Sequence, residues 1–483
     1  MQFIKKIWFF AIFILAALSL GYYGMLMYYN QYSYWADEVY SINLFKANVV
    51  QLLAMTAGDV HPPLYYILGK LFSSIWGYSG LSFRLFSYLF YCLTILMTVS
   101  IVRREFGDIT AIITIIFISL PVTALEHVLS ARPYEIARFF VTACFLYGYK
   151  ALKYKKPCYW CIFTISAIAA AYTHYFALIE VAFIVCGVYA LSLYKRENFR
   201  ECIITAAVCI LTYLPWLGTL VKTFARKNGS GWLMSYPDLY ECLMYIYGRA
   251  DGLSLIMIIL LAITIVLFIL RGVFRQIERY IPVEKDIITV MVIALSCILG
   301  TCVTGIVVSE ICSPCIHTRS LYPLTAVAAV LLGGAVNYWL QRLNTISFPC
   351  SVLLTIIILL GTCASFAEKC EYYQHALVIK KDGNDTLAAV ERLKEIDPSE
   401  TLATNLIHLW WNVLDYYIDY KDCFIYTGDT IQSYEGNTIY CLMGYPFNAE
   451  NTEWLREKGW TEIEYEGAYT LAGYHYHLYY LTK

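Results

Sequence analysis

The chain has 483 residues, of which 59% are hydrophobic and only 15% are charged. Soluble domains are usually about 45–50% apolar and about 25% charged, so this composition excludes an ordinary soluble protein and predicts a polytopic membrane protein. The net charge of −1 gives no indication of a nucleic-acid partner, and we expect none.

A short basic segment, Met1–Lys6, opens the chain, and an apolar run from Ile7 to about Tyr29 follows it. This run is too long for the core of a cleaved signal peptide, so it predicts an uncleaved first span. Further apolar runs lie at about 81–102, 109–125, 134–152, 157–174, 176–194, 201–221, 252–271, 287–309, 321–340 and 350–367. Because about 20 apolar residues cross a bilayer, we expect a mainly α-helical protein with about eleven transmembrane helices.

Basic residues gather in alternate connections between these runs. They are Lys5, Lys6, Arg103, Arg104, Lys150, Lys153, Lys155, Lys156, Lys195, Arg196, Arg200, Arg271, Arg275, Arg279, Lys285 and Arg342. Positively charged connections stay on the cytoplasmic side of a membrane, so we expect the N-terminus there. The connections that contain residues 37–61, 126–132, 222–251 and 309–319 are then extracytoplasmic, as is the C-terminus.

Beyond about Glu368 the apolar runs shorten and charged residues return. We therefore expect residues 1–367 to form a transmembrane module and residues 368–483 to form a small extracytoplasmic α/β domain. Asp385 is expected to cap one helix and Asn451–Lys458 to form another. Strands are expected at residues 401–404, 423–426, 438–443 and 469–480, the last of them interrupted at Gly473.

The first extracytoplasmic loop, about residues 30–80, contains the sequence YWADEVYS with the adjacent carboxylates Asp37 and Glu38. Such a pair is either a solvated helix start or part of a catalytic site. In the second interpretation one carboxylate acts as a general base, which takes the proton of an acceptor hydroxyl while its oxygen attacks the anomeric carbon of a sugar. The neighbouring carboxylate would hold the acceptor or raise the pKa of the base.

Asp59 and His61 stand in the same loop, directly before Pro62 and Pro63. They are either ordinary turn residues or a second wall of the same pocket, with Asp59 as an acceptor-binding or second acidic group. Their spacing would also complete a metal site with Asp37, so a divalent metal stays open, and no other cofactor is indicated. A disulfide within the Cys312-x-x-Cys315 segment also stays open.

Polar side chains also cluster at the extracytoplasmic ends of later spans: Arg84, Glu126, His127, Arg132, Tyr134, Arg138, His317 and Arg319. The arginines are either interfacial anchors or partners of an anionic lipid phosphate, which a guanidinium binds through two parallel hydrogen bonds. We assign donor phosphate binding to Arg84, Arg132, Arg319, His61 and Tyr134, and we keep Glu126 as a second acidic candidate. Glu180, inside an apolar run after His174, is either functional or reaches water at the membrane surface.

Together these segments resemble the bacterial branch of glycosyltransferase family 39, in the membrane-embedded GT-C superfamily that includes protein O-mannosyltransferases and the lipid A aminoarabinose transferase. The resemblance rests on YWADEVYS, DVHPPLYYILGKL, SFRLFSYLF, LSARPYEIARFF, THYFA, YLPWL and HTRSLYPL, and it covers about residues 7–340. The chain departs from the family at Ser130, where many members carry an acidic residue, and at Ser320, where many carry Tyr.

The resemblance implies a GT-C architecture in which Asp37 is the catalytic carboxylate, Glu38 stands beside it, and Arg132 and Arg319 lie near the donor phosphate. It implies an enzyme of the bacterial cell membrane that moves a sugar with inversion from a polyprenyl-phosphate donor to an extracytoplasmic glycan, lipid or protein. The alternative is a transporter, flippase or polymerase of lipid-linked sugars. Transporters place charges at the membrane midplane and often have two similar halves, whereas here the charges cluster in exterior loops and no repeat is visible.

Overall fold

The computed structural model describes residues 2–29, 34–225, 235–247, 252–273, 285–312, 314–378, 388–397, 399–406, 413–414, 423–471 and 474–483. Over these ranges the chain divides into two compact units. The first comprises Met1–Gly24, Val49–Leu68 and Leu85–Tyr373, and the second comprises Met25–Asn48, Gly69–Arg84 and Gln374–Lys483. The helices that contribute residues to both units are α1 (Gln2–Tyr29), α4 (Leu64–Trp76), α5 (Gly80–Met97) and α17 (Phe348–Val378).

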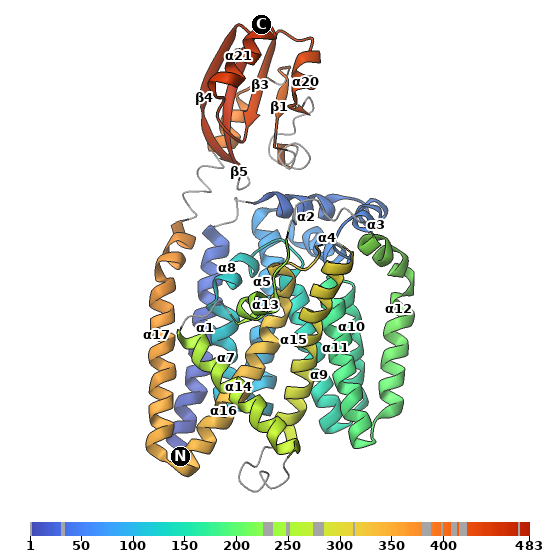
Figure 1. Cartoon of the computed structure of the whole chain (residues 1–483), viewed down its shortest axis with the longest axis vertical. Coiled ribbons are helices and arrows are strands. Elements are labelled where there is room, and N and C mark those ends of the chain that lie inside the picture. Colours follow the sequence, from blue (N-terminus) through green and yellow to red (C-terminus); the bar gives the residue numbers. More distant parts are fainter. Residues whose placement is uncertain are drawn as a thin grey trace. The chain divides into compact units, whose positions relative to one another are not determined.

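The first unit is a bundle of long helices (Figure 1). It includes α3 (Val49–Gly58), and α5 continues through the π-helical turn η1 (Thr98–Val102) into α6 (Arg103–Phe106). The later elements are α7 (Asp108–Ser119), α8 (Val122–His127), α9 (Tyr134–Tyr154), α10 (Pro157–Ala171), α11 (Tyr175–Lys195), α12 (Phe199–Ala225), α13 (Leu239–Ile246), α14 (Gly252–Val273), α15 (Lys285–Ile311), the 3₁₀ segment η3 (Thr318–Leu324) and α16 (Thr325–Ile346).

Every apolar run that was predicted to span the membrane overlaps one of these helices, which confirms a mainly helical, multi-pass membrane protein. Six helical segments in the described part of the chain are long and apolar enough to cross a bilayer: Phe10–Tyr28, Gly80–Phe106, Tyr175–Lys195, Phe199–Thr223, Asp286–Ile311 and Thr318–Ile346. Helices α7 and α10 are shorter, and α9 carries Glu135, Arg138 and Lys150 along its length. The predicted number of eleven spans is therefore not confirmed.

Small residues let helices of the bundle approach one another closely. A Cβ atom at Gly333 of α16 would lie 2.8 Å from the carbonyl oxygen of Thr110 on α7, and the Thr110 hydroxyl donates to the Gly333 carbonyl at 3.3 Å. A Cβ atom at Gly187 of α11 would lie 3.1 Å from the Cα atom of Ile293 on α15. Because apolar burial does not drive helices together in lipid, such close packing and such hydrogen bonds hold the bundle.

The second unit contains a five-stranded sheet of order β2-β1-β3-β5-β4 (Figure 1). Its strands are β1 (Leu402–Thr404), β2 (Cys423–Ile425), β3 (Thr438–Met443), β4 (Glu462–Leu471) and β5 (Tyr474–Thr482). Strand β1 runs parallel to β2 and β3, whereas β5 is antiparallel to both of its neighbours. The buried Trp460, Ile439 and Leu481 are part of its hydrophobic core, and the helices α20 (Gly428–Ser433) and α21 (Ala449–Glu457) are part of the same fold.

Most of the predicted elements of this small domain are confirmed. Strands β1, β2 and β3 lie within one residue of the predicted ranges, and α21 ends just before Gly459, which has a positive φ of 93°. The predicted strand 469–480 overlaps two strands, because the segment belongs to an antiparallel hairpin whose first strand already begins at Glu462. Glu462 and Glu464 alternate with Ile463 and Tyr465 on this edge strand, and charged side chains are common on sheet edges. Asp385 and Gly473, for which a cap and a strand break were predicted, lie outside the described residues.

Candidate functional site

The adjacent carboxylates of the YWADEVYS segment lie in the first turn of α2 (Ala36–Lys46), in the second unit. The Glu38 side chain turns back toward the helix start, where its Oε2 accepts a hydrogen bond from the Trp35 backbone N–H at 3.3 Å. Glu38 is only 2% exposed, and its Oε1 lies 3.4 Å from Nη1 of Arg84 on α5. The Arg84 guanidinium also lies over the ring of Tyr34, 4.9 Å from its centroid. Glu38 is therefore a buried, ion-paired helix cap.

Asp37 has a different environment from its neighbour. Successive side chains of a helix point in different directions, so Asp37 need not be buried although Glu38 is. Asp37 remains partly exposed, and its backbone carbonyl accepts a hydrogen bond from Ser41 Oγ at 3.1 Å. A carboxylate in the first turn is also favoured by the positive end of the helix dipole. Of the two adjacent carboxylates, Asp37 is thus the one that water or substrate can reach.

The first unit holds a second group of predicted site residues, built on the turn before Pro62 and Pro63. His61 Nδ1 lies 3.6 Å from Asp59 Oδ2 and 3.4 Å from Nη2 of Arg132. His61 and Arg132 are only 4% and 5% exposed, respectively. Burial by itself would raise the pKa of Asp59, but the hydrogen bond and charge of His61 and the charge of Arg132 outweigh it and lower that pKa.

Aromatic rings extend this group across three further elements. The His61 ring centroid lies 5.0 Å from that of His174 and 6.1 Å from that of Tyr134, at the first position of α9. His174 caps α11, because its Nδ1 accepts a hydrogen bond from the Phe176 backbone N–H at 3.1 Å. Burial, together with the charges of His61 and Arg132, holds the pKa of His174 well below its usual range. His174 is therefore a neutral hydrogen-bond acceptor at neutral pH.

His127 continues the ring contacts from Tyr134 toward η3. Its ring centroid lies 4.7 Å from Tyr134 and 4.6 Å from Tyr322, and its Nε2 lies 3.2 Å from the hydroxyl oxygen of Tyr245 on α13. Burial, and then the charge of Arg319, lowers the pKa of His127 to about 3. Arg319 itself is partly exposed, and its backbone N–H donates to His317 Nδ1 at 3.1 Å, so the imidazole of His317 caps η3.

A fully buried network lies beneath these residues, and sequence reasoning missed its central carboxylate. Arg138 donates to Glu135 Oε1 from Nε at 3.1 Å and from Nη2 at 2.8 Å, while Tyr322 donates to Glu135 Oε2 at 2.8 Å. The Arg138 guanidinium also stacks over the Tyr322 ring at 4.7 Å. The i,i+3 spacing of Glu135 and Arg138 was a readable signal. The hydrogen bond from Tyr322 to Glu135 was not readable, because the two residues are far apart in the sequence.

The remaining predicted acids fall in contrasting places. The Glu126 side chain is 51% exposed, and its Oε2 lies 4.0 Å from His127 Nε2. Glu180, on α11, is fully buried, and neither carboxylate oxygen has a hydrogen-bond partner among the residues that the structure describes.

Cys312 and Cys315 are free thiols. Within the described ranges, no three His, Cys, Asp or Glu side chains lie close enough together to hold a metal ion.

The structure thus brings Glu38 and Arg84 together in one group, and Asp59, His61, Arg132 and Tyr134 together in another. Arg84 was predicted to bind a donor phosphate, but its guanidinium lies against the carboxylate of Glu38. Sequence reasoning missed two residues outside these groups: Glu135, in the buried network with Arg138 and Tyr322, and Tyr245, which contacts His127. Asp238 and Glu241 form a capping box at the start of α13, and this D-x-x-E pattern could have revealed the helix that carries Tyr245.

Comparison with known proteins gives a family match over part of the chain and a fold match over 97% of it. Residues 60–218 match the protein-family model described as dolichyl-phosphate-mannose-protein mannosyltransferase. The crystal structure of apo ArnT from Cupriavidus metallidurans is 11% identical in sequence and superposes with a TM-score of 0.58 over 97% of both chains. The same protein bound to undecaprenyl phosphate is 12% identical, with a TM-score of 0.57 and the same coverage. Comparison with curated proteins finds no significant match.

Proposed function

We propose that this chain, which has the fold of ArnT and is related to the protein mannosyltransferases over residues 60–218, is a membrane glycosyltransferase with a polyprenyl-phosphate sugar as donor. ArnT has been crystallised with undecaprenyl phosphate. A polyprenyl phosphate is what remains of such a donor once its sugar has left. The acceptor is an extracytoplasmic hydroxyl of a glycan, lipid or protein, and its identity stays open.

The observation that carries the proposal is the different burial of two adjacent carboxylates. A general base must reach the acceptor hydroxyl, and Asp37 is partly exposed at the start of α2. Glu38 is 2% exposed and ion-paired with Arg84. Glu38 therefore acts as a positioning residue, which fixes the first turn of α2 and with it the direction of the Asp37 side chain.

The chemical step needs only one base. Asp37 accepts the proton of the acceptor hydroxyl while that oxygen forms a bond to C1 of the sugar, on the face opposite the phosphate. The bond between C1 and the phosphate oxygen breaks, and the lipid phosphate leaves with the electron pair. Because a phosphate is a stable anion, it needs no proton from a general acid. Attack from the opposite face inverts the configuration at C1.

The group around His61 and Arg132 is our candidate for donor phosphate binding. A lipid phosphate needs cations and hydrogen-bond donors at the membrane surface, and guanidinium groups supply both. Arg132 lies against the His61 imidazole, and Arg319 is partly exposed near His127. Asp59 offsets part of the positive charge of this group. The remaining positive charge attracts an anionic ligand but still lets it dissociate.

The network of Glu135, Arg138 and Tyr322 has a positioning role in this proposal. It joins the first turn of α9 to η3, so it holds Tyr134 and Arg319 on their respective elements. All three residues are fully buried, and removal of one partner would leave an uncompensated polar or charged group.

The proposal is tested by incubating the purified protein with a panel of polyprenyl-phosphate sugars and candidate acceptors. Mass spectrometry of the lipid fraction then follows free polyprenyl phosphate, and the acceptor fraction is analysed for added sugar. We expect release of polyprenyl phosphate to require both a matching donor and an acceptor. If intact lipid-linked sugar moves between the two faces of a proteoliposome with no release of phosphate, the chain is a transporter and the proposal is wrong.

A further inference from the structure

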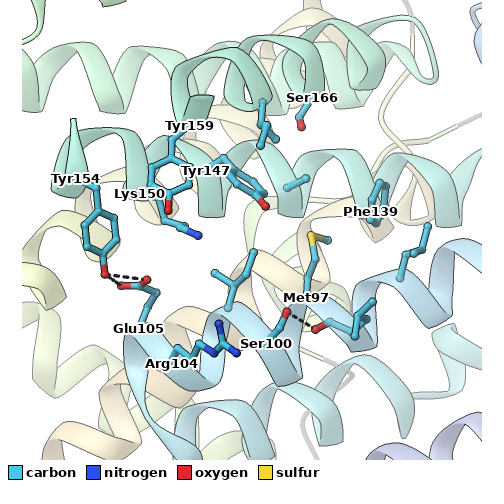
Figure 2. Close-up of a pocket in the computed structure, with 15 residues that line it drawn as sticks. Met97, Ser100, Arg104, Glu105, Phe139, Tyr147, Lys150, Tyr154, Tyr159 and Ser166 are labelled. Carbon is cyan, nitrogen blue, oxygen red and sulfur yellow. Dashed lines mark hydrogen bonds between the residues drawn. The ribbon is translucent and has the colours of Figure 1, made fainter. Parts of the chain in front are cut away.

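A cavity of about 640 Å³ lies in the first unit beside α9 (Figure 2). It is enclosed by the segment from α5 to α6, by α9 and by α10. Tyr134 and Lys150 mark the two ends of α9, and at 1.5 Å per residue they lie about 24 Å apart along the helix axis. The basic part of the cavity therefore lies far from Tyr134, although the lining extends along α9 to Phe139. The inference below does not depend on the residues assigned to sugar transfer.

One part of the cavity is apolar and reaches the surface of the helix bundle. Its lining includes Leu96, Met97, Phe139, Ala143 and Ile162. Leu96 is 60% exposed and Ile162 is 37% exposed, although both belong to apolar helices of a membrane bundle. Apolar side chains left open at this depth are covered by lipid chains in the membrane.

The other part of the cavity carries two cations on opposite walls (Figure 2). Arg104 is exposed and comes from α6, and Lys150 comes from α9, where its Nζ lies 4.4 Å from the centroid of the Tyr159 ring. Neither cation forms an ion pair with a carboxylate among the residues that the structure describes. The nearby Glu105 is instead paired with Lys153, at 3.1 Å, and accepts a hydrogen bond from Tyr154 at 2.9 Å. Within the described residues, the carboxylate of Glu105, which also lines the cavity, is thus taken up by Lys153 and Tyr154 and not by Arg104 or Lys150.

The backbone is also unusual beside the cavity. Helix α5 passes into α6 through the π-helical turn η1, and Ser100 and Ile101 of this turn line the cavity. Single π turns inside helices are uncommon and often occur at functional sites. Here the turn supplies part of the cavity wall, together with Lys150 and Tyr147.

We propose that this cavity binds an anionic glycerophospholipid of the leaflet at the basic end of the bundle. The phosphodiester would lie between Arg104 and Lys150, with Tyr147 and Tyr159 beside it. One acyl chain would cover the apolar wall formed by Leu96, Phe139 and Ala143. The bound lipid would hold the π-helical turn against α9 and α10.

The experiment is native mass spectrometry of the full-length protein, transferred from nanodiscs of equal phosphatidylglycerol and phosphatidylcholine content with identical acyl chains. We expect the wild-type protein to retain phosphatidylglycerol in preference to phosphatidylcholine. Each basic side chain near an anionic headgroup contributes about fivefold in affinity, so the double variant R104Q/K150Q should lose about 10- to 30-fold of that preference. K150R should retain most of it, because the positive charge remains.

The matched control removes two other cations at the same end of the bundle. Lys156 directly precedes α10, and Arg200 is the second residue of α12. Both are exposed, and neither lines the cavity. K156Q/R200Q should keep the lipid preference. A143F keeps both cations but fills the apolar wall, and it should weaken retention of phosphatidylglycerol while the protein stays monodisperse.

Three results would overturn the proposal. The first is equal retention of both phospholipids by the wild-type protein. The second is an equal loss of preference in R104Q/K150Q and in the control, which would mean that the general surface charge attracts the lipid. The third is complete displacement of phosphatidylglycerol by an equimolar amount of undecaprenyl phosphate, which would assign the cavity to a single-chain lipid phosphate instead.

Discussion

Arg84 Nη1 lies 3.4 Å from Glu38 Oε1, and Arg84 Nη2 lies 3.5 Å from Glu38 Oε2. Both side chains are buried, so this is an ion pair largely removed from water. Adjacent carboxylates in a sequence suggest a shared role, but this pairing separates the two. Glu38 is committed to a structural contact, which leaves Asp37 as the accessible acid at the start of α2.

The first prediction concerns that ion pair. R84Q should destabilise the protein by about 3 kcal/mol, because it leaves the Glu38 carboxylate buried without its charge partner. The double variant E38Q/R84Q should recover part of the loss, since no uncompensated charge remains. Thermal unfolding in detergent measures both effects. The exposed Arg456 provides the control, and R456Q should change stability by less than about 0.5 kcal/mol. Equal stability of R84Q and wild type would contradict a structural role for the pair.

The second prediction concerns the donor phosphate. R132A should raise the apparent KM for the lipid-linked sugar by about 10- to 100-fold, because a hydrogen bond to a charged group is lost. R132K should recover only part, since an ammonium group lacks the forked pair of donors. Steady-state kinetics at saturating acceptor separate donor from acceptor effects, and R200A serves as a control for net charge. An unchanged donor KM in R132A would show that Arg132 only supports the fold around His61.

The third prediction concerns pH. The pKa of His127 is lowered from 6.5 to about 3 in the folded protein, so between these values the unfolded chain binds a proton that the folded chain does not. The stability from this group is therefore complete above about pH 6.5 and falls as the pH drops toward 3. We expect the unfolding temperature to decrease between pH 7 and pH 4.5. In H127Q the decrease should be shallower, whatever the absolute stability, and an identical slope would contradict the assignment.

The fourth prediction concerns orientation, which we infer from the basic connections alone. A reporter fused after Lys483 should be extracytoplasmic, and one fused after Lys156 should be cytoplasmic. Cysteine labelling of intact cells with an impermeant reagent measures both. If the accessibility of both positions were reversed, the residues assigned to sugar transfer would face the cytoplasm.

Local patterns in the sequence predicted the elements, and distant contacts escaped them. Apolar runs located the helices, and the motif around Asp37 indicated the start of α2, because both depend on neighbouring residues. The contact between Arg84 and Glu38 was not predicted, since the two residues lie 46 positions apart. Tyr322 reaches Glu135 across 187 positions, a contact that no local spacing reveals. The first strand of the β4–β5 hairpin was missed although Glu462, Glu464 and Glu466 alternate with Ile463 and Tyr465, the pattern of a strand with one charged face.

The most direct test of the account is sugar transfer by D37N, with E38Q measured beside it. The Asn side chain keeps the shape of Asp37 but cannot accept the proton of the acceptor, and a positioned general base contributes about 10²–10⁴-fold in rate. We predict that D37N loses transfer by about this factor while it still inserts into membranes and binds the donor. E38Q should lose less activity and more stability. Normal turnover in D37N, or a dead E38Q beside an active D37N, would contradict the assignment of Asp37 as the base.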